Sequence, residues 1–224
     1  MRALRQQSLS IFFGVIFVLA LVGQSVAGLA GYNEDQTSHG SAPIGYGVFV
    51  TSSDFVVDVA ENWQSEFLQF FLFILATIWL IQRGSPESKK PGDEGSGSDK
   101  DQLVAEFAKP NSPRWAKVRG ARLWLYSNSL LLVMASIFVL SWLAQSIAGQ
   151  VVYNEEQAEH AQPSLTWASY VQSPDFWNRT LQNWQSEFLA VGCMIAFSIF
   201  LRQRGSSESK PVGTPHAESA TEGE

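Results

Sequence analysis

The sequence predicts an all-α membrane protein with four transmembrane helices, arranged as two tandem two-helix repeats with pseudo-two-fold symmetry. Three observations carry this prediction. The apolar residues gather in long blocks, the second half of the chain repeats the first, and almost all basic residues lie outside the blocks. Because a bilayer core about 30 Å thick needs roughly 20 helical residues, a block of that length can cross a membrane.

The four apolar blocks have the length of membrane spans. The first and third predict spans over about 8–30 and 126–149. The second and fourth are long enough only if each begins at a tryptophan, which gives spans over about 63–83 and 184–204. Tryptophan at one end and arginine at the other is typical of a helix that ends at both membrane interfaces.

The repeat is the strongest feature of the sequence. Residues 8–89 align with residues 129–210 at a constant offset of 121, without a gap, and 36 of the 82 positions are identical. This pattern indicates an internal duplication. Because each copy contains an even number of spans, both copies are expected to have the same orientation in the membrane.

The first span could also be interpreted as a cleaved signal peptide, because a basic start, an apolar run and small residues occur in that order. However, the segment Gln24–Gly28 recurs with one conservative change at Gln145–Gly149, in the middle of the chain. A signal peptide has no role there. We therefore expect the first span to be retained as a structural element.

The repeats divide the chain into four segments. Residues 1–89 form the first repeat and residues 123–210 the second. Residues 90–122 are expected to be a flexible cytoplasmic linker with a basic juxtamembrane end, and residues 211–224 a disordered cytoplasmic tail. Both are rich in Gly, Ser, Pro and charged residues, a composition that does not bury a core.

The distribution of charge predicts the topology. Of the 15 Lys and Arg residues, 14 lie at the N-terminus, between residues 83 and 122, or from Arg202 onward, and Arg179 is the exception. By the positive-inside rule, both termini and the linker are cytoplasmic, and the two acidic loops face outward. The basic residues before the third span are expected to contact anionic lipid headgroups, so the lipid bilayer is the expected partner and nucleic acid is not.

Three short polar motifs are much more alike between the copies than the rest of the repeat. The NWQSEFL motif is identical in all seven positions. Each motif occurs once per copy: the YNEEQ motif with a following histidine at 32–39 and 153–160, the NWQSEFL motif at 62–68 and 183–189, and the QRGSxESK motif at 82–89 and 203–210.

These motifs resemble a family of uncharacterised bacterial membrane proteins built from tandem units. The resemblance covers nearly the whole chain except the linker and the tail, with one departure, Asp35 in place of the second Glu of YNEEQ. It implies a multi-pass protein of the bacterial cytoplasmic (inner) membrane. It implies no activity.

A polar site within the membrane is the first candidate functional site. Counted along the expected helices, Gln24 and Glu66 lie at similar depth and are expected to hydrogen-bond across the hairpin. These side chains either lock the helix pairs or serve a proton, ion or ligand, since an ionisable group in a span is costly. The candidate residues are Gln24, Asn62, Glu66, Gln145, Asn183 and Glu187.

A cluster in the outer loops is the second candidate. Asp35 with His39, and Glu156 with His160, are spaced i, i+4 on one helical face. Such pairs suit a divalent metal ion, but no familiar ligand spacing is present and a hydrogen-bonded cluster explains the same residues, so the sequence assigns no metal and no cofactor. The cluster comprises Tyr32, Glu34, Asp35, His39, Tyr153, Glu155, Glu156 and His160.

The QRGSxESK motif is expected to mark the cytoplasmic end of a helix. Arg83 would favour the negative helix terminus and Gly84 would supply the left-handed stop. Arg204 and Gly205 would do the same in the second copy.

Two function classes follow from this architecture. The first is a non-enzymatic scaffold or interaction protein whose acidic outer loops bind a partner, because no segment outside the spans reaches the size of an ordinary domain. The second is a small transporter or channel that uses Glu66 and Glu187 between the repeats. Since four helices hardly form a conduction path alone, the second class predicts a homo-oligomer.

Overall fold

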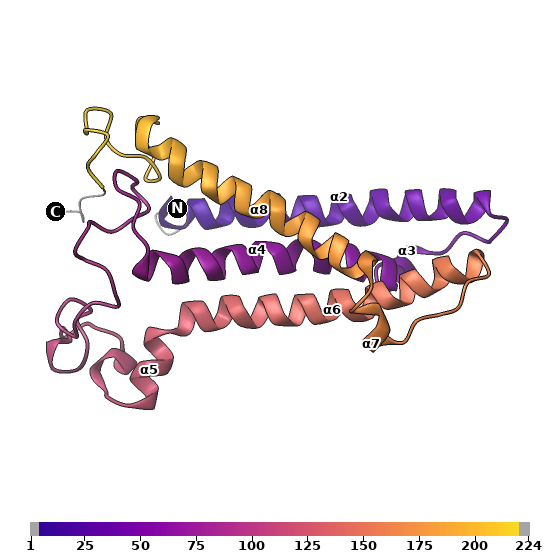
Figure 1. Ribbon diagram of the computed structural model, residues 1–224, viewed down its shortest axis with the longest axis horizontal. Coiled ribbons are helices and arrows are strands. Elements are labelled where there is room, and N and C mark those ends of the chain that lie inside the picture. Colours follow the sequence, from indigo (N-terminus) through magenta and orange to yellow (C-terminus); the bar gives the residue numbers. More distant parts are fainter. Residues whose placement is uncertain (1–4, 220–224) are drawn as a thin grey trace. The chain divides into compact units, whose positions relative to one another are not determined.

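The computed structural model describes residues 5–219, and every regular element in that part of the chain is helical (Figure 1). The all-α class is therefore confirmed. The seven α-helices are α2 (Ser8–Ser38), α3 (Tyr46–Phe49), α4 (Ser53–Trp79), α5 (Ala121–Ser127), α6 (Ser129–Glu159), α7 (Trp167–Tyr170) and α8 (Pro174–Phe200). Two single turns of 3-10 helix, η1 (Ala105–Phe107) and η2 (Arg114–Lys117), lie in the linker.

Helices α4 and α8 begin well before the tryptophans that the sequence placed at the membrane interface. Serine N-caps explain their starts. The Ser52 hydroxyl accepts a hydrogen bond from the Phe55 N–H at 3.3 Å, and Ser173, 121 residues later, accepts one from Phe176 at 3.3 Å. Pro174 follows as the first residue of α8. Serine caps and a proline in this position favour helix initiation.

Two helices, α2 and α6, are long and apolar enough to cross a membrane, and within residues 5–219 no other helix meets the same standard. Helices α4 and α8 begin with polar turns, and the NWQSEFL motif interrupts their apolar runs. Two apolar helices are weak support for membrane association.

The chain forms two compact units, which are described separately. The first contains the described residues up to Ala60 together with Ala144–Gln172. The second contains Glu61–Leu143 and the described residues from Ser173 onward. Helices α4 and α6 each contribute to both units.

Close glycine–aromatic packing joins each long helix of the first unit to the short helix that follows it. A β-carbon on Gly28 of α2 would lie 2.9 Å from Cζ of the buried Phe49 in α3. A β-carbon on Gly149 of α6 would lie 2.6 Å from Oη of Tyr170 in α7, whose side chain is 1% exposed. Both contacts involve residues at the same offset of 121, and both require glycine for the close approach.

An aromatic cluster packs α6 against α8 in the second unit. The indole of Trp142 lies at the centre, with ring centroids of four neighbours 5.7–6.1 Å away. These distances suit favourable aromatic contacts. The neighbours are Phe138, Phe176, Trp177 and Trp184.

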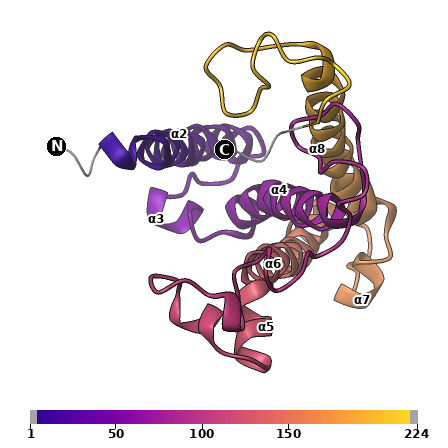
Figure 2. The ribbon, with the colours of Figure 1, turned by 90° about the vertical axis from the view of Figure 1, so that its left-hand side faces the viewer.

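The linker contains local structure near its basic end. Helices η1, η2 and α5 pack on one another beside the start of α6 (Figure 2). Arg119 and Glu106 form an ion pair across this region. The flexibility of the linker and the disorder of the tail stay predictions.

Gly149→Ala is expected to destabilise the protein by about 1–3 kcal/mol relative to Gly23→Ala, because the added methyl group collides with a buried ring. Gly23 is the matched control, since a β-carbon added there would have no described neighbour within 4 Å. Adding Tyr170→Phe removes the nearest atom and should recover part of the loss. Thermal unfolding in detergent measures the three variants, and equal stability of the two alanine variants would contradict the packing.

Candidate functional site

A buried hydrogen bond joins the two copies of the NWQSEFL motif. The indole N–H of Trp184 in α8 donates to Oε1 of Gln64 in α4 at 2.7 Å. Gln64 is fully buried, and its Nε2 has no hydrogen-bond partner in the described part of the chain. A buried amide left without a partner is costly, so this bond stabilises the pairing of α4 with α8.

An ion pair that sequence reasoning missed lies one helical turn away. The Arg179 guanidinium donates to Oε1 of Glu61 at 2.7 Å and lies 3.6 Å from Asp175 Oδ2. The Glu61 side chain is largely buried and that of Arg179 is half-buried, and the pair again connects α8 to α4. The sequence contained a signal for this ion pair, because Arg179 is the exceptional basic residue outside the expected cytoplasmic segments.

The acidic residues of the NWQSEFL motif do not share a hydrogen bond. Glu66 is exposed and Glu187 is half-buried, and their carboxylates lie close enough to repel each other. Asn62 is exposed, whereas the Asn183 amide donates to the Arg179 carbonyl at 3.0 Å. The structure therefore brings the two predicted carboxylates into one region, and no basic side chain within residues 5–219 forms an ion pair with either of them.

The two candidate glutamines differ in burial. Gln145 is 1% exposed, and neither polar atom of its amide has a hydrogen-bond partner among the described residues. Gln24 is half-buried. The expected hydrogen bond from Gln24 to Glu66, and its equivalent from Gln145 to Glu187, stay predictions because the partners belong to different units.

In the YNEEQ motif, each histidine returns to the helix at i, i+4 as expected. His39 Nδ1 lies 3.6 Å from Asp35 Oδ1 and 3.0 Å from the Asp35 carbonyl. His160 Nδ1 lies 3.0 Å from the carbonyl of Glu156, so its contact is to the backbone. No group of three metal-ligating side chains occurs within residues 5–219.

The other residues of this cluster are distributed over the helix surface. The rings of Tyr32 and Tyr153 pack against Phe49 and Tyr170, with centroids 5.7 and 5.5 Å apart. The remaining acidic members are exposed. They are Glu34, Glu155 and Glu156.

The best-defined contact of the YNEEQ motif involves its asparagine, which the sequence analysis did not select. The Asn33 side chain accepts from the Ile44 N–H at 2.7 Å and donates to the Ile44 carbonyl at 3.0 Å. Asn154 makes the same pair of bonds with Leu165, at 2.7 and 2.9 Å. The asparagine thus fixes the loop that follows the long helix. Its presence at the equivalent position of both copies was the sequence feature that could have identified it.

The QRGSxESK motif lies beyond the helix ends, which corrects the expected positions. Helices α4 and α8 end at Trp79 and Phe200, four residues before Arg83 and Arg204. In α8 the Arg202 guanidinium donates to the carbonyls of the last turn, which stabilises that terminus. The left-handed glycines that follow the two motif arginines therefore shape a loop instead of ending a helix.

Serine hydroxyls give this loop the same form in both copies. Ser88 accepts from the Gln82 N–H at 2.8 Å, and Ser209 accepts from the Gln203 N–H at 2.9 Å. The first serine of each motif likewise accepts from the glutamate N–H two residues later, at 3.1 and 3.2 Å. The pattern of polar residues that the two copies share thus encodes a local backbone structure.

The motif lysine holds the segment that follows it. Lys89 donates to the Gly95 carbonyl at 2.5 Å. Lys210, 4% exposed, donates to the carbonyls of Pro215, His216 and Glu218 at 3.2, 3.1 and 2.9 Å. Three carbonyl acceptors compensate for burying the ammonium group.

The glutamates of the two loops interact across the copies. Partial burial raises the pKa of the Glu87 carboxyl, and repulsion from Glu208 and a hydrogen bond with it act in the same direction. These effects disfavour the charged form of the Glu87 carboxyl.

The fold and these sites define an all-helical protein with two helices able to cross a membrane and with paired polar motifs on its helices and loops. The chain belongs to the family described as a domain of unknown function, DUF6766, which matches residues 1–221. No curated protein and no solved structure matches the chain.

Near pH 7, Glu87→Gln is expected to raise the melting temperature, because it removes a charge that partial burial and Glu208 disfavour. The raised pKa means that the folded wild type binds this proton more tightly than the unfolded chain, so the wild type gains stability as pH falls through the folded-state pKa. The advantage of the variant should therefore vanish below the ordinary value of 4.5. Melting curves from pH 7 to below this value measure the difference in melting temperature between variant and wild type, with the exposed Asp99→Asn as control. A difference that does not depend on pH would contradict the raised pKa of Glu87.

Proposed function

We propose that the chain is a multi-pass protein of the bacterial inner membrane and acts as a non-enzymatic scaffold. Helices α2, α4, α6 and α8 each cross the membrane, and the termini and linker are cytoplasmic. The two acidic outer loops bind a partner, which is a protein or a second copy of the chain. The observation that carries the proposal is the buried bond from Trp184 to Gln64, because it uses a repeated polar motif to hold two helices together.

Several features support four spans. Beyond their polar first turns, α4 and α8 are apolar, and the NWQSEFL motif finds hydrogen-bond partners within the protein. Polar side chains in a membrane are tolerated when they pair between helices. All basic residues except Arg179 fall on one side of this arrangement, in keeping with the positive-inside rule.

The fixed outer loops support a scaffold. Asn33 and Asn154 hold the loops by paired backbone hydrogen bonds, which gives them a defined shape. Exposed acidic side chains surround these points. A rigid loop with exposed charge suits recognition of a partner by electrostatic complementarity.

A transporter or channel is the alternative, and Glu66 with Glu187 is the observation that favours it. The two carboxylates come from equivalent positions of the repeat and repel each other, so a cation between them would relieve the repulsion. An assembly of several copies would then form the conduction path.

Cysteine labelling tests the topology in a Cys193→Ser background. With four spans, Ser41→Cys and Gln162→Cys react with a membrane-impermeant maleimide in intact cells, whereas Lys100→Cys reacts only after permeabilisation. If α2 and α6 alone crossed the membrane, Lys100→Cys would react from outside and Gln162→Cys would not. The two topologies thus predict opposite labelling at Lys100→Cys and Gln162→Cys, whereas Ser41→Cys reacts in both.

A pair of variants tests which polar groups of the NWQSEFL motif stabilise the helix pair. Trp184→Phe should lower the free energy of unfolding by about 1–3 kcal/mol, because it leaves Gln64 buried without its partner. Glu66→Gln with Glu187→Gln should leave stability unchanged or raised, since it removes repulsion. The exposed Trp124→Phe controls for loss of an indole.

The same double glutamate variant decides the function class when the protein is reconstituted in liposomes. A scaffold gives no cation flux above protein-free liposomes, in either wild type or variant. Flux in the wild type that the double variant abolishes would refute the scaffold and support the transporter.

A further inference from the structure

The two QRGSxESK loops carry cavities at equivalent places. One, of about 530 Å³, is lined by Arg83, Lys90 and Pro91. The other, of about 620 Å³, is lined by the residues 121 positions later, Arg204, Pro211 and Val212, and by the loop between them. Each copy of the QRGSxESK loop therefore forms a cavity at the equivalent position.

The tail of the chain closes the first cavity. Its opposite wall consists of Ala217, Glu218 and Ser219. The Arg83 Nε–H donates to the Ala217 carbonyl at 3.3 Å, and the Gly84 N–H donates to the Ser219 hydroxyl at 3.1 Å.

Glycine is required where the tail passes the first loop. A β-carbon on Gly84 would collide with the carbonyl of His216, and the positive φ of Gly84 also excludes most other residues. The first loop thus binds an extended peptide segment through one main-chain carbonyl, one hydroxyl and close backbone contact.

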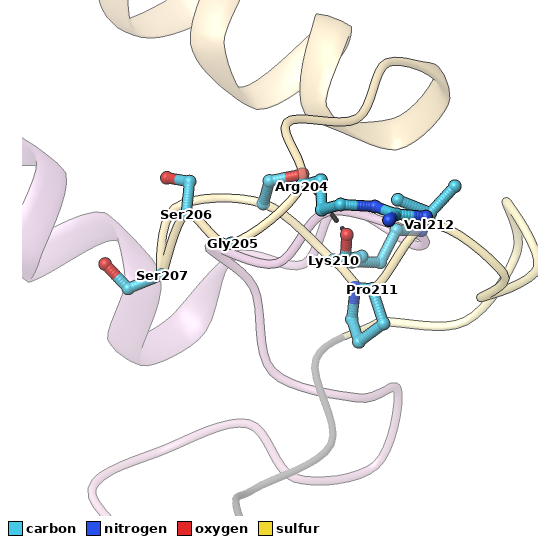
Figure 3. Close-up of a pocket in the computed structure, with 8 residues that line it drawn as sticks. Arg204, Gly205, Ser206, Ser207, Lys210, Pro211 and Val212 are labelled. Atoms are coloured by element: carbon cyan, nitrogen blue, oxygen red, sulfur yellow. Dashed lines mark hydrogen bonds between the residues drawn. The ribbon is translucent and has the colours of Figure 1, made fainter.

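The second loop has the equivalent arginine and glycine, with Pro211 and Val212 in place of Lys90 and Pro91, and no other segment of residues 5–219 lines its cavity. Every residue that lines its cavity lies within 204–212. Gly205 has the same positive φ as Gly84, yet a β-carbon added to Gly205 would have no described neighbour within 4 Å. The guanidinium of Arg204 is exposed and makes no hydrogen bond or ion pair with any residue from 5 to 219, and Figure 3 shows it beside Lys210 and Val212 at the rim.

We propose that the Gly205 loop is a peptide-binding site and that its ligand is the tail segment Ala217–Ser219 of a second copy of this chain. Arg204 donates to the main-chain carbonyl of Ala217, and the Gly205 N–H donates to the hydroxyl of Ser219, as Arg83 and Gly84 do within one chain. The second copy is the fitting occupant because its tail has the sequence already bound at the first loop, and on binding here that tail leaves the first loop of its own chain. This site does not depend on the proposed membrane topology or on the outer loops.

The test uses the full chain in detergent and a fluorescent synthetic peptide of residues 211–224, with fluorescence anisotropy as the readout. We expect saturable binding that Arg204→Gln weakens about tenfold, the effect of losing one charge-assisted hydrogen bond. Arg122→Gln removes an exposed charge elsewhere and should not change the affinity. A peptide of the same composition in scrambled order should not bind saturably.

A third variant distinguishes the open site from exchange at the occupied one. Arg83→Gln weakens the hold on the chain's own tail but leaves the Gly205 loop intact, so the peptide should still bind and remain sensitive to Arg204→Gln. Absence of saturable binding overturns the proposal. So does binding that depends on Arg83 and not on Arg204, or that falls equally with Arg122→Gln. Equal melting temperatures of the variants show that folding is unchanged.

Discussion

The pairing of α4 with α8 depends on the satisfaction of buried polar groups, and the Trp184–Gln64 hydrogen bond is its centre. Between apolar helices, the free-energy cost of a buried amide without a partner exceeds the net stabilisation that one hydrogen bond contributes. Helix pairings that lack this hydrogen bond are therefore disfavoured. The ion pair between Arg179 and Glu61 adds a second link one turn away. Both links join residues of the first copy to residues of the second, so within their unit they hold the duplicated halves together.

The four long helices could be predicted from the sequence because the apolar blocks and their length are local properties, whereas the short helices α3, α5 and α7 were not predicted. The ends could not be placed as well. The start of α4 depends on the Ser52 cap, which lies outside the apolar block, and its end at Trp79 precedes the arginine that looks like a helix terminus. The loop after Trp79 is fixed by serine-to-backbone bonds, which leave no periodic signal.

The candidate residues were found because the two copies could be compared, but their partners could not be derived this way. Comparison of copies selects positions that are the same, such as Glu66 and Asn33. It cannot select contacts between different residue types, and Arg179 with Glu61 has Asp58 and Gln182 at the equivalent positions. The ion pair between Arg179 and Glu61 therefore could not be found by comparing the two copies.

The equivalent loops of the two copies have different surroundings. Lys89 and Lys210 hold the segments that follow them, but the segment after Lys89 is the linker and the one after Lys210 is the tail. Only the tail reaches the loop of the other copy, through Arg83 and Gly84. Residues 217–219 occupy the cavity of the first loop, and no segment outside 204–212 lines the cavity of the second. This difference in occupancy is the basis of the proposal that the second loop binds another chain.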